Sequence, residues 1–350
     1  MTPRFSTSTA ALLGAVSIGT AASAGYVQLI DLPTLQSTGG GAFLSSTIDG
    51  NQGYALLNST GGTAQVVRID DIGGANNVST LTSLADFDAA STGTVTNVSG
   101  TIFDNGNSLY IIDNTNDIVW TVSKANGSII QLIDIAAAKP TLTGSLGPTF
   151  AEVDVDGDLV YYESGADTLD KSDGFLDGFN TILTDTELDT LTGDDTPTGL
   201  AIGPDGVYYL GQGSSSAGEN IYFFDPSDGS SGVFLTEADI VGGDDVSFSA
   251  TAFTAVGNTL YARDGGTNDR FISIDLSTGT VTTVIDEADL VAGPAMSDFA
   301  IDFSLFNGEL AWSQTIGAGS QVAGIYAIPE PASLALAGLG ALAMLRRRSA

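Results

Sequence analysis

The chain has 350 residues, with 42 acidic against 10 basic side chains and a formal net charge of −32 at pH 7. It contains neither cysteine nor histidine, which excludes disulfides, Cys/His zinc sites and nucleophilic sites that need a histidine base. The negative charge also argues against nucleic-acid binding, because the phosphate backbone is bound through Lys and Arg. The composition therefore favours an acidic, β-rich exported protein.

The first 24 residues have the layout of a secretory signal. Arg4 is their only charge, and an apolar run extends from Ala10 to Ala22. Small residues stand at Ala22 and Ala24, the two positions that a signal peptidase reads. We expect the mature chain to begin at Gly25. A membrane helix is the alternative, but the run is short and rich in Gly, Ser and Thr for a stable span.

Between the two ends, the sequence repeats about every 50 residues. Each repeat contains an aromatic residue after a turn-forming stretch, and an acidic residue followed by an apolar one. The aromatic positions are Tyr54, Tyr110, Tyr161, Tyr209, Tyr261 and Trp312. The acidic–apolar pairs are Asp86-Phe87, Asp134-Ile135, Glu187-Leu188, Asp239-Ile240 and Asp289-Leu290. Two independent markers that share one period indicate a repeat architecture.

Each repeat is typical of four strands separated by turns rich in Gly, Asn and Asp. The clearest one, residues 249–290, contains SATAFTAV, TLYARD, RFISIDL and TVTTVIDEADL. Four antiparallel strands per repeat predict an all-β fold, a six-bladed β-propeller over residues 25–328. A β-sandwich or a β-solenoid is the alternative. We expect no long amphipathic helix, and at most a single turn around Leu188.

The sixth repeat lacks a fourth strand before the C-terminal tail begins. Residues 26–32, YVQLIDL, are of the same type as IIQLIDI at residues 129–135, and Asp31-Leu32 is a further copy of the acidic–apolar pair. We therefore expect the N-terminal strand to complete the last blade, which removes an exposed sheet edge.

Acidic loops make calcium the cofactor to consider, because hard cations take oxygen ligands. The candidate ligands lie in two loops between blades and are Asp194, Asp195, Asp244 and Asp245. Further acids on the same face of a propeller are Asp113, Asp117, Asp264 and Asp269. A solvated acidic rim is the alternative. Residues 151–163 resemble an EF-hand loop, but Leu159 stands where glycine is needed, so we prefer a strand–turn–strand there.

No motif for catalysis is found, and we name no catalytic residue. The chain has no phosphate-binding loop, and GQGSSSAG at residues 211–218 departs from the G-x-S-x-G pattern. With 42 carboxylates to choose from, the sequence cannot select a catalytic pair. We predict a non-catalytic binding or structural propeller. The alternative is a metal-dependent propeller enzyme, either a lactonase or a polysaccharide-acting hydrolase or lyase.

The C-terminal segment 329–350 has three parts in a fixed order. Pro329, Glu330 and Pro331 come first, an apolar run follows at 332–345, and Arg346, Arg347 and Arg348 come last. As a helix the run would span roughly 21 Å, short of a hydrocarbon core of about 30 Å. Its arginines are expected on the cytoplasmic side of the inner membrane.

This segment resembles the PEP-CTERM sorting signal of bacterial envelope proteins, and a chance hydrophobic tail is the alternative. The resemblance implies recognition by an exosortase, a membrane protease or transpeptidase, with processing near Pro329, Glu330 and Pro331. It implies transient contact with the inner membrane through the tail. It also implies a final place at the outer cell surface or in the extracellular matrix, often beside exopolysaccharide.

Overall fold

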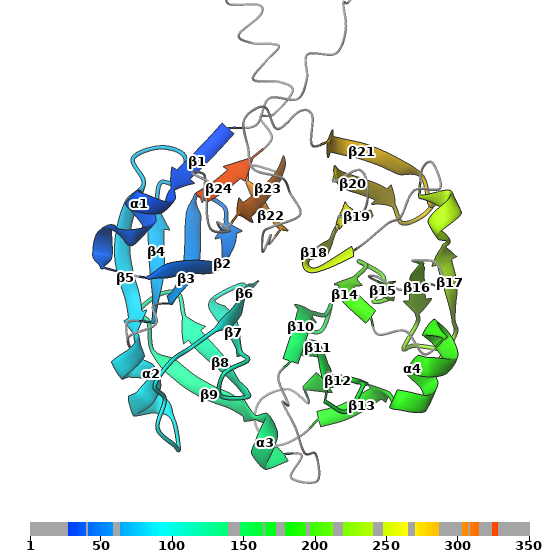
Figure 1. The fold of residues 1–350 in the computed structure, drawn as a ribbon, viewed down its shortest axis with the longest axis horizontal. Coiled ribbons are helices and arrows are strands. Elements are labelled where there is room, and N and C mark those ends of the chain that lie inside the picture. The colour runs from blue at the N-terminus through cyan, green and yellow to red at the C-terminus, as the bar shows by residue number, and fades with distance from the viewer. Residues whose placement is uncertain are drawn as a thin grey trace, which may run out of the picture.

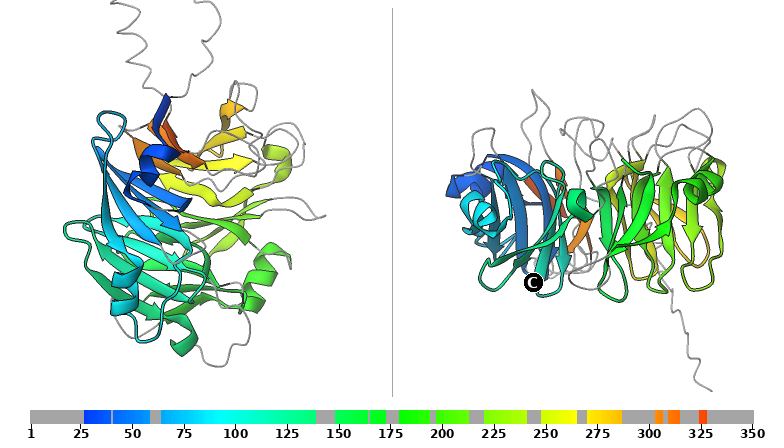
Figure 2. Two further views of the ribbon diagram at one scale, coloured as in Figure 1. Left: turned by 60° about the vertical axis from the view of Figure 1, so that its left-hand side comes forward. Right: turned by 90° about the horizontal axis from the view of Figure 1, so that it is seen from below.

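The strands of the chain form four-stranded antiparallel sheets around a central axis, which is the architecture of a β-propeller (Figure 1). The computed structural model describes residues 27–39, 41–58, 64–138, 148–163, 165–172, 179–193, 197–212, 220–240, 248–264, 270–286, 303–306, 309–314 and 324–327. Seen from the edge, the sheets stand side by side in a flat disc (Figure 2). The prediction of an all-β propeller with four-stranded antiparallel sheets is confirmed.

The described strands make up six such sheets, and within each sheet the strands follow one another from the axis outward. The first sheet contains β2 (Ala42–Asp49), β3 (Gln52–Asn58), β4 (Gln65–Asp70) and β5 (Asn77–Ser83). The second contains β6 (Gly100–Asn105), β7 (Ser108–Asp113), β8 (Ile118–Ser123) and β9 (Ile129–Asp134). The third contains β10 (Pro148–Val153), β11 (Leu159–Glu163), β12 (Thr168–Ser172) and β13 (Phe179–Leu183). The next two contain β14 (Pro197–Ile202), β15 (Tyr208–Gln212), β16 (Ile221–Phe224) and β17 (Ser231–Leu235); and β18 (Phe248–Val256), β19 (Thr259–Asp264), β20 (Arg270–Asp275) and β21 (Val281–Asp286).

The remaining sheet contains the first and the last described strands. It contains β22 (Phe303–Phe306), β23 (Glu309–Gln314), β24 (Gly324–Ala327) and, at its outer edge, β1 (Val27–Asp31). β1 pairs antiparallel with β24, and Val27 lies opposite Ala327. The first and last described strands of the chain are therefore neighbours in one ladder.

The innermost strands contact one another in a cycle around the axis. β2 contacts β6, β6 contacts β10, and the contacts continue through β14, β18 and β22 back to β2. One link is a hydrogen bond from the backbone N–H of Ile102 on β6 to Ser45 Oγ on β2, at 2.9 Å. Another is the Thr198 hydroxyl on β14, which donates to the carbonyl oxygen of Phe248 on β18 at 2.9 Å.

The repeated aromatic residue always lies in the second strand of a sheet, from Tyr54 in β3 to Trp312 in β23. Five of the six are buried, and several fill the layer between neighbouring sheets. Tyr54, for example, packs against Ile102 and Leu109 of the next sheet. The ring of Trp312 meets that of Phe271 edge to face, with centroids 5.2 Å apart. The repeated aromatic residue therefore marks the position at which a sheet packs against its neighbour.

The acidic–apolar pair has a different role, because in the described copies it follows the outermost strand and lies in, or next to, a short helix or 3₁₀ turn. The copy at Asp289-Leu290 lies outside the described residues. These helices are α1 (Leu32–Leu35), α2 (Leu84–Ala90), α3 (Ile135–Ala138), α4 (Asp185–Thr192) and the 3₁₀ turn η2 (Glu237–Asp239), and a second 3₁₀ turn, η1 (Gln36–Thr38), extends α1. In Figure 1 they lie on the outside of the disc. None of the helices in the described part of the chain has the length and hydrophobicity that a membrane span requires.

The helix at Leu188 is longer than predicted, since α4 has eight residues where a loop or a single turn was expected. It begins with a capping box between Thr184 and Glu187, and it ends at Gly193, whose φ of 77° suits glycine. Leu188 is buried against the sheet. The caps and one buried leucine thus stabilise a helix that its modest apolar content did not predict.

Candidate functional site

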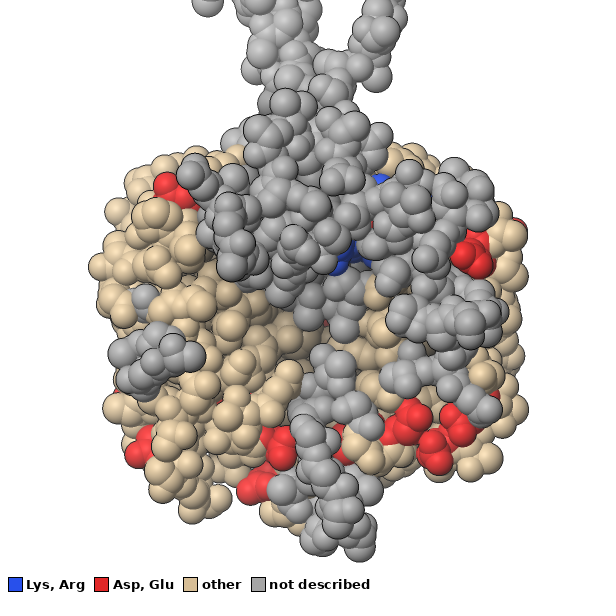
Figure 3. All heavy atoms as spheres, in the orientation of Figure 1, with Lys and Arg blue, Asp and Glu red and all other residues tan. Residues whose placement is uncertain are grey.

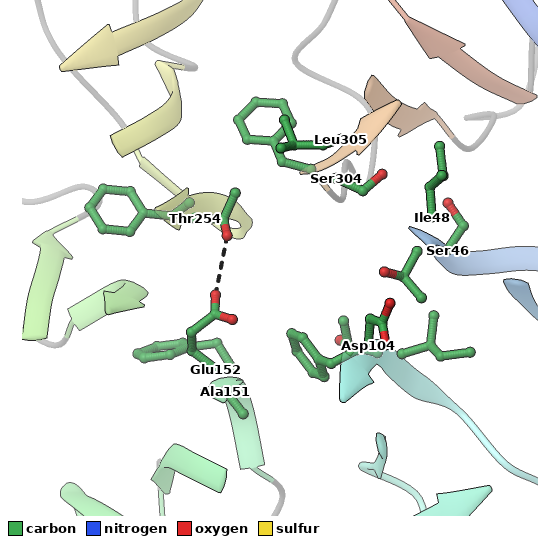
Figure 4. Close-up of a pocket in the computed structure, with 15 residues that line it drawn as sticks. Ser46, Ile48, Asp104, Ala151, Glu152, Thr254, Ser304 and Leu305 are labelled. Atoms are coloured by element: carbon green, nitrogen blue, oxygen red, sulfur yellow. Dashed lines mark hydrogen bonds between the residues drawn. The ribbon is translucent and has the colours of Figure 1, made fainter. Parts of the chain in front are cut away.

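A cavity of about 250 Å³ lies where the inner strands converge on the axis (Figure 4). Strands β2, β6, β10, β18 and β22 contribute its wall. Hydroxyl groups come from Ser46, Thr47, Thr101, Thr254 and Ser304. Two carboxyl groups, those of Asp104 and Glu152, also line it, and phenylalanine rings supply apolar surface. The volume suits a ligand smaller than a typical drug-sized molecule.

Glu152 reaches into this cavity from β10 and has only neutral hydrogen-bond partners among the described residues. Its Oε2 accepts a hydrogen bond from the Thr254 hydroxyl at 3.2 Å, which Figure 4 shows, and its Oε1 accepts one from the N–H of Val153 at 3.3 Å. Neither partner is charged, and no Lys or Arg among the described residues contacts the group. Burial raises the pKa of Glu152 to about 7, although both hydrogen bonds oppose the rise.

Asp104, the other carboxyl group of the cavity, has a cationic partner. Lys124 Nζ lies 2.5 Å from Asp104 Oδ1 and 2.7 Å from Asp49 Oδ2, so the ammonium group bridges two sheets. The same ammonium lies 5.4 Å from the centre of the Tyr54 ring. Burial raises the pKa of Asp104, and the hydrogen bond and charge of Lys124 counteract it. Asp104 thus has a cationic partner, which it shares with Asp49, and Glu152 has none among the described residues.

The stretch that resembles an EF-hand loop is a strand–turn–strand, as predicted, between β10 and β11. Asp154, Asp156 and Asp158 do come together there, with one oxygen of each within 4.8 Å of the others. Lys171 Nζ already lies among them, 2.6 Å from Asp154 and 3.1 Å from Asp158. Burial lowers the pKa of Lys171, but the hydrogen bonds to Asp154 and Asp158 outweigh it and raise the pKa above its usual value. A protein ammonium group therefore takes the position that a metal ion would need.

The loop acids at the ends of the second strands are internal structural groups where the structure describes them. Asp113 is fully buried and accepts hydrogen bonds from Trp120 Nε1 at 3.2 Å and Asn116 Nδ2 at 2.6 Å. Burial raises its pKa. Asp264 is also buried and accepts from Arg270 Nε at 2.9 Å. Both acids were candidates for a cation-binding face or, alternatively, a solvated rim; neither interpretation fits them, because each is buried and paired inside the fold.

Other predicted site residues lie outside the described part of the chain. They are Ala22, Ala24, Asp194, Asp195, Asp244, Asp245, Asp269, Pro329, Glu330, Pro331, Arg346, Arg347 and Arg348. A further acidic group, Asp167, Asp185 and Asp189, was not anticipated and brings three carboxylates within 4.8 Å near α4. Sequence reasoning also missed Glu152 and Asp104. The sequence offered one signal for these two residues. Each is an acidic residue within the first strand of a repeat, where a side chain that faces inward reaches the axis.

Most of the basic side chains that the structure describes form ion pairs with acidic neighbours. In the described segments, ion pairs with aspartates engage Arg68, Lys124, Lys171 and Arg270. On the face drawn in Figure 3, acidic groups lie toward the outer edge of the disc. The protein thus presents carboxylates as its main surface charge, which disfavours anionic ligands.

Residues 327–349 match the family model of the PEP-CTERM protein-sorting motif. No curated protein matches the chain.

Solved structures resemble the body of the chain at low identity. One is a structural genomics protein of unknown function from Bacteroides thetaiotaomicron, with a TM-score of 0.55, 15% identity, and coverage of 86% of this chain and 74% of that chain. The gluconolactonase XC5397 from Xanthomonas campestris has a TM-score of 0.51 and 14% identity, and the match covers 87% and 89% of the two chains. A catalytically inactive virginiamycin B lyase from Staphylococcus aureus, solved with quinupristin, has a TM-score of 0.50 and 10% identity over 86% and 98%. Such identities show the fold alone. The sorting motif and the fold together make the chain an exported protein with a β-propeller body.

Proposed function

We propose that the protein is a non-catalytic binding or structural propeller of the outer cell surface or extracellular matrix. An exosortase would process its tail during export. The observation that carries the proposal is the place of the sorting motif, which starts at residue 327, where β24 and the propeller end. Matrix components such as exopolysaccharide are the expected partners.

The axial cavity supports a binding role. It combines several hydroxyl groups with a carboxylate and aromatic surface, a mixture that suits small polar ligands. The sequence contains neither His nor Cys, two residue types that commonly serve as general base or nucleophile near neutral pH. A propeller that presents a small polar cavity at its axis is suited to recognition.

We further infer that the sheets act as six blades of one closed ring, with β1 as the closing strand. The cycle of contacts between inner strands and the β1–β24 ladder support this inference. Closure would remove the free edge of β24 and tie the two chain ends together. Calcium at Asp194, Asp195, Asp244 and Asp245 stays a prediction.

Expression of the full chain in an exosortase-containing bacterium tests the proposed delivery. The wild-type chain is expected to lose its C-terminal peptide and to appear at the cell surface or in the matrix fraction. A variant with Pro329, Glu330 and Pro331 all changed to alanine is expected to keep its tail and to remain with the membrane. Alanine at Pro226, in a turn of the body, is the matched control. Equal processing of wild type and tail variant, measured by mass spectrometry of the C-terminus, contradicts the proposal.

The alternative function is a metal-dependent enzyme, and the uncompensated carboxylate of Glu152 at the axis is the observation that favours it. Turnover assays after loading with Ca²⁺, Mg²⁺ or Mn²⁺ separate the two functions. A binding or structural protein leaves lactones and polysaccharides unchanged under these conditions. Metal-dependent turnover that disappears in Glu152→Gln establishes the enzyme instead.

A further inference from the structure

The carboxylate of Glu152 lies in the cavity without a positively charged partner among the described residues. A carboxylate taken out of bulk water is costly unless a cation or several donors compensate it. The described residues give Glu152 one hydroxyl and one backbone N–H as partners, and no cation. On the opposite side of the cavity, Asp104 adds negative potential that Lys124 only partly offsets, since Lys124 also pairs with Asp49.

A metal ion matches this arrangement poorly. Calcium takes six to eight oxygen ligands and usually several carboxylates. Where the structure describes the chain, three carboxylates converge at two places, and neither group lines the cavity. Within the cavity, Asp104 is held by Lys124, which leaves Glu152 as the one carboxylate available to a cation. A single carboxylate surrounded by hydroxyls matches an ammonium group, which has three N–H donors and needs no fixed coordination number.

The rest of the wall indicates what the ammonium group would be attached to. The hydroxyls of Thr101 and Ser304 can donate and accept hydrogen bonds, and that of Thr254, which donates to Glu152, can still accept one. Such a wall suits a ligand with several hydroxyl groups of its own. Half-buried Phe103 and Phe303 supply apolar and aromatic surface for C–H groups or for a cation. The volume of about 250 Å³ limits the ligand to roughly one sugar unit.

We propose that the axial cavity binds a polyhydroxylated primary ammonium compound of the size of one amino sugar or amino alditol, with its ammonium group on Glu152. This inference rests on the binding role proposed above and names the ligand class for it. It concerns the cavity alone, so it is independent of how the tail is processed.

Calorimetric titration of the secreted protein at pH 8 tests the proposal with a matched pair of ligands. The probe is 1-amino-1-deoxysorbitol, and sorbitol is the control that has a hydroxyl in place of the amine. The amine is expected to bind at least tenfold more tightly than sorbitol. Glu152→Gln is expected to remove that difference, because it keeps the size of the side chain and loses its charge. Ser304→Leu, which fills the cavity, is expected to abolish binding of both compounds.

Asp228→Asn is the charge-matched control, since Asp228 lies exposed in a turn far from the axis, and it should bind as wild type does. Circular dichroism of each variant confirms that it is folded. Equal affinity for amine and sorbitol overturns the proposal, as does unchanged binding by Glu152→Gln. Saturation by Ca²⁺ with displacement of the amine would establish a metal site in its place. Because Glu152→Gln leaves the tail intact, a failure of export would count against the proposed function and not against the cavity.

Discussion

At the scale of single residues, two acidic environments in this protein differ in how their charge is balanced. Three aspartates around Lys171 share a cation that the chain itself supplies. Glu152, at the axis, has only neutral partners among the described residues. The contrast predicts different responses to pH and to cations.

Glu152 should make stability fall as pH rises. Its pKa is about 7 in the folded protein against a usual 4.5, so between these values the folded state holds a proton that the unfolded chain has released. Stability is therefore lost as pH rises toward 7, and the loss is complete above it. Glu152→Gln should be more stable than wild type by about 1–3 kcal/mol at pH 8, after allowance for water in the cavity, and little different at pH 4. Thermal unfolding at both pH values measures this, and a difference that does not vary with pH contradicts it.

The ammonium group of Lys171 should take the place of a metal ion among Asp154, Asp156 and Asp158. Lys171→Met keeps most of the side-chain length but leaves three carboxylates facing one another, which we expect to cost roughly 2–4 kcal/mol. Calcium should then bind among the three carboxylates of the variant and raise its melting temperature. In the wild type, Lys171 occupies this place, so calcium should not stabilise the protein through this site. Arg68→Met is the control, because the Arg68–Asp70 pair is more exposed and should contribute less than about 1 kcal/mol. A variant as stable as wild type, or one that calcium does not stabilise, would show that Lys171 has no such role.

At the scale of elements, the repeated acidic residue is a helix cap. Asp86, Glu187 and Asp239 each accept hydrogen bonds from the N-cap residue three positions earlier. The apolar residue that follows is buried in four of the described copies, as in Phe87, Ile135, Leu188 and Ile240. In the described segments, β1, β5, β9, β13 and β17 are thus each followed by a short helix or 3₁₀ turn, after which the chain returns toward the axis.

Removal of one cap tests this account. Thr184→Ala removes the hydroxyl that accepts the N–H of Glu187 at 3.4 Å and donates to its carboxylate at 2.8 Å. We expect a loss of about 1 kcal/mol in the free energy of unfolding. Thr186→Ala makes the same chemical change two residues later, where no cap exists, and should be neutral or slightly stabilising. Equal effects of the two substitutions in denaturant titrations would argue against a capping role.

The features of the fold that could be predicted from the sequence follow from local patterns of residues. Alternating strands, glycine turns and the spacing from Tyr54 to Trp312 depend on local rules, and they predicted four-stranded sheets. The helix at Leu188 was missed because its stability comes from capping and from one buried leucine, which a short polar segment does not reveal. Glu152 could not be chosen among 42 acidic residues, because its importance arises only when β10 packs at the axis.

At the scale of the whole molecule, the first and last described strands pair in one sheet. β1 hydrogen-bonds to β24, although some 300 residues separate them in the sequence. Every other described sheet is built from consecutive strands, so this sheet alone depends on both ends. Under the proposed closure, the last sheet is complete only once β24 is available, and the sorting motif begins at the end of that strand.

Disulfide trapping between β1 and β24 tests the closed ring most directly, since the chain has no cysteine of its own. The register places Val27 opposite Ala327 and Gln28 opposite Tyr326, and neighbouring antiparallel pairs alternate in spacing, so one of these pairs suits a disulfide. The account predicts that one double-cysteine variant forms an intramolecular bond in the oxidised protein and melts at a higher temperature than its reduced form. Free thiols or dimers in both variants, with no change in melting temperature, would contradict closure of the ring by the N-terminal strand.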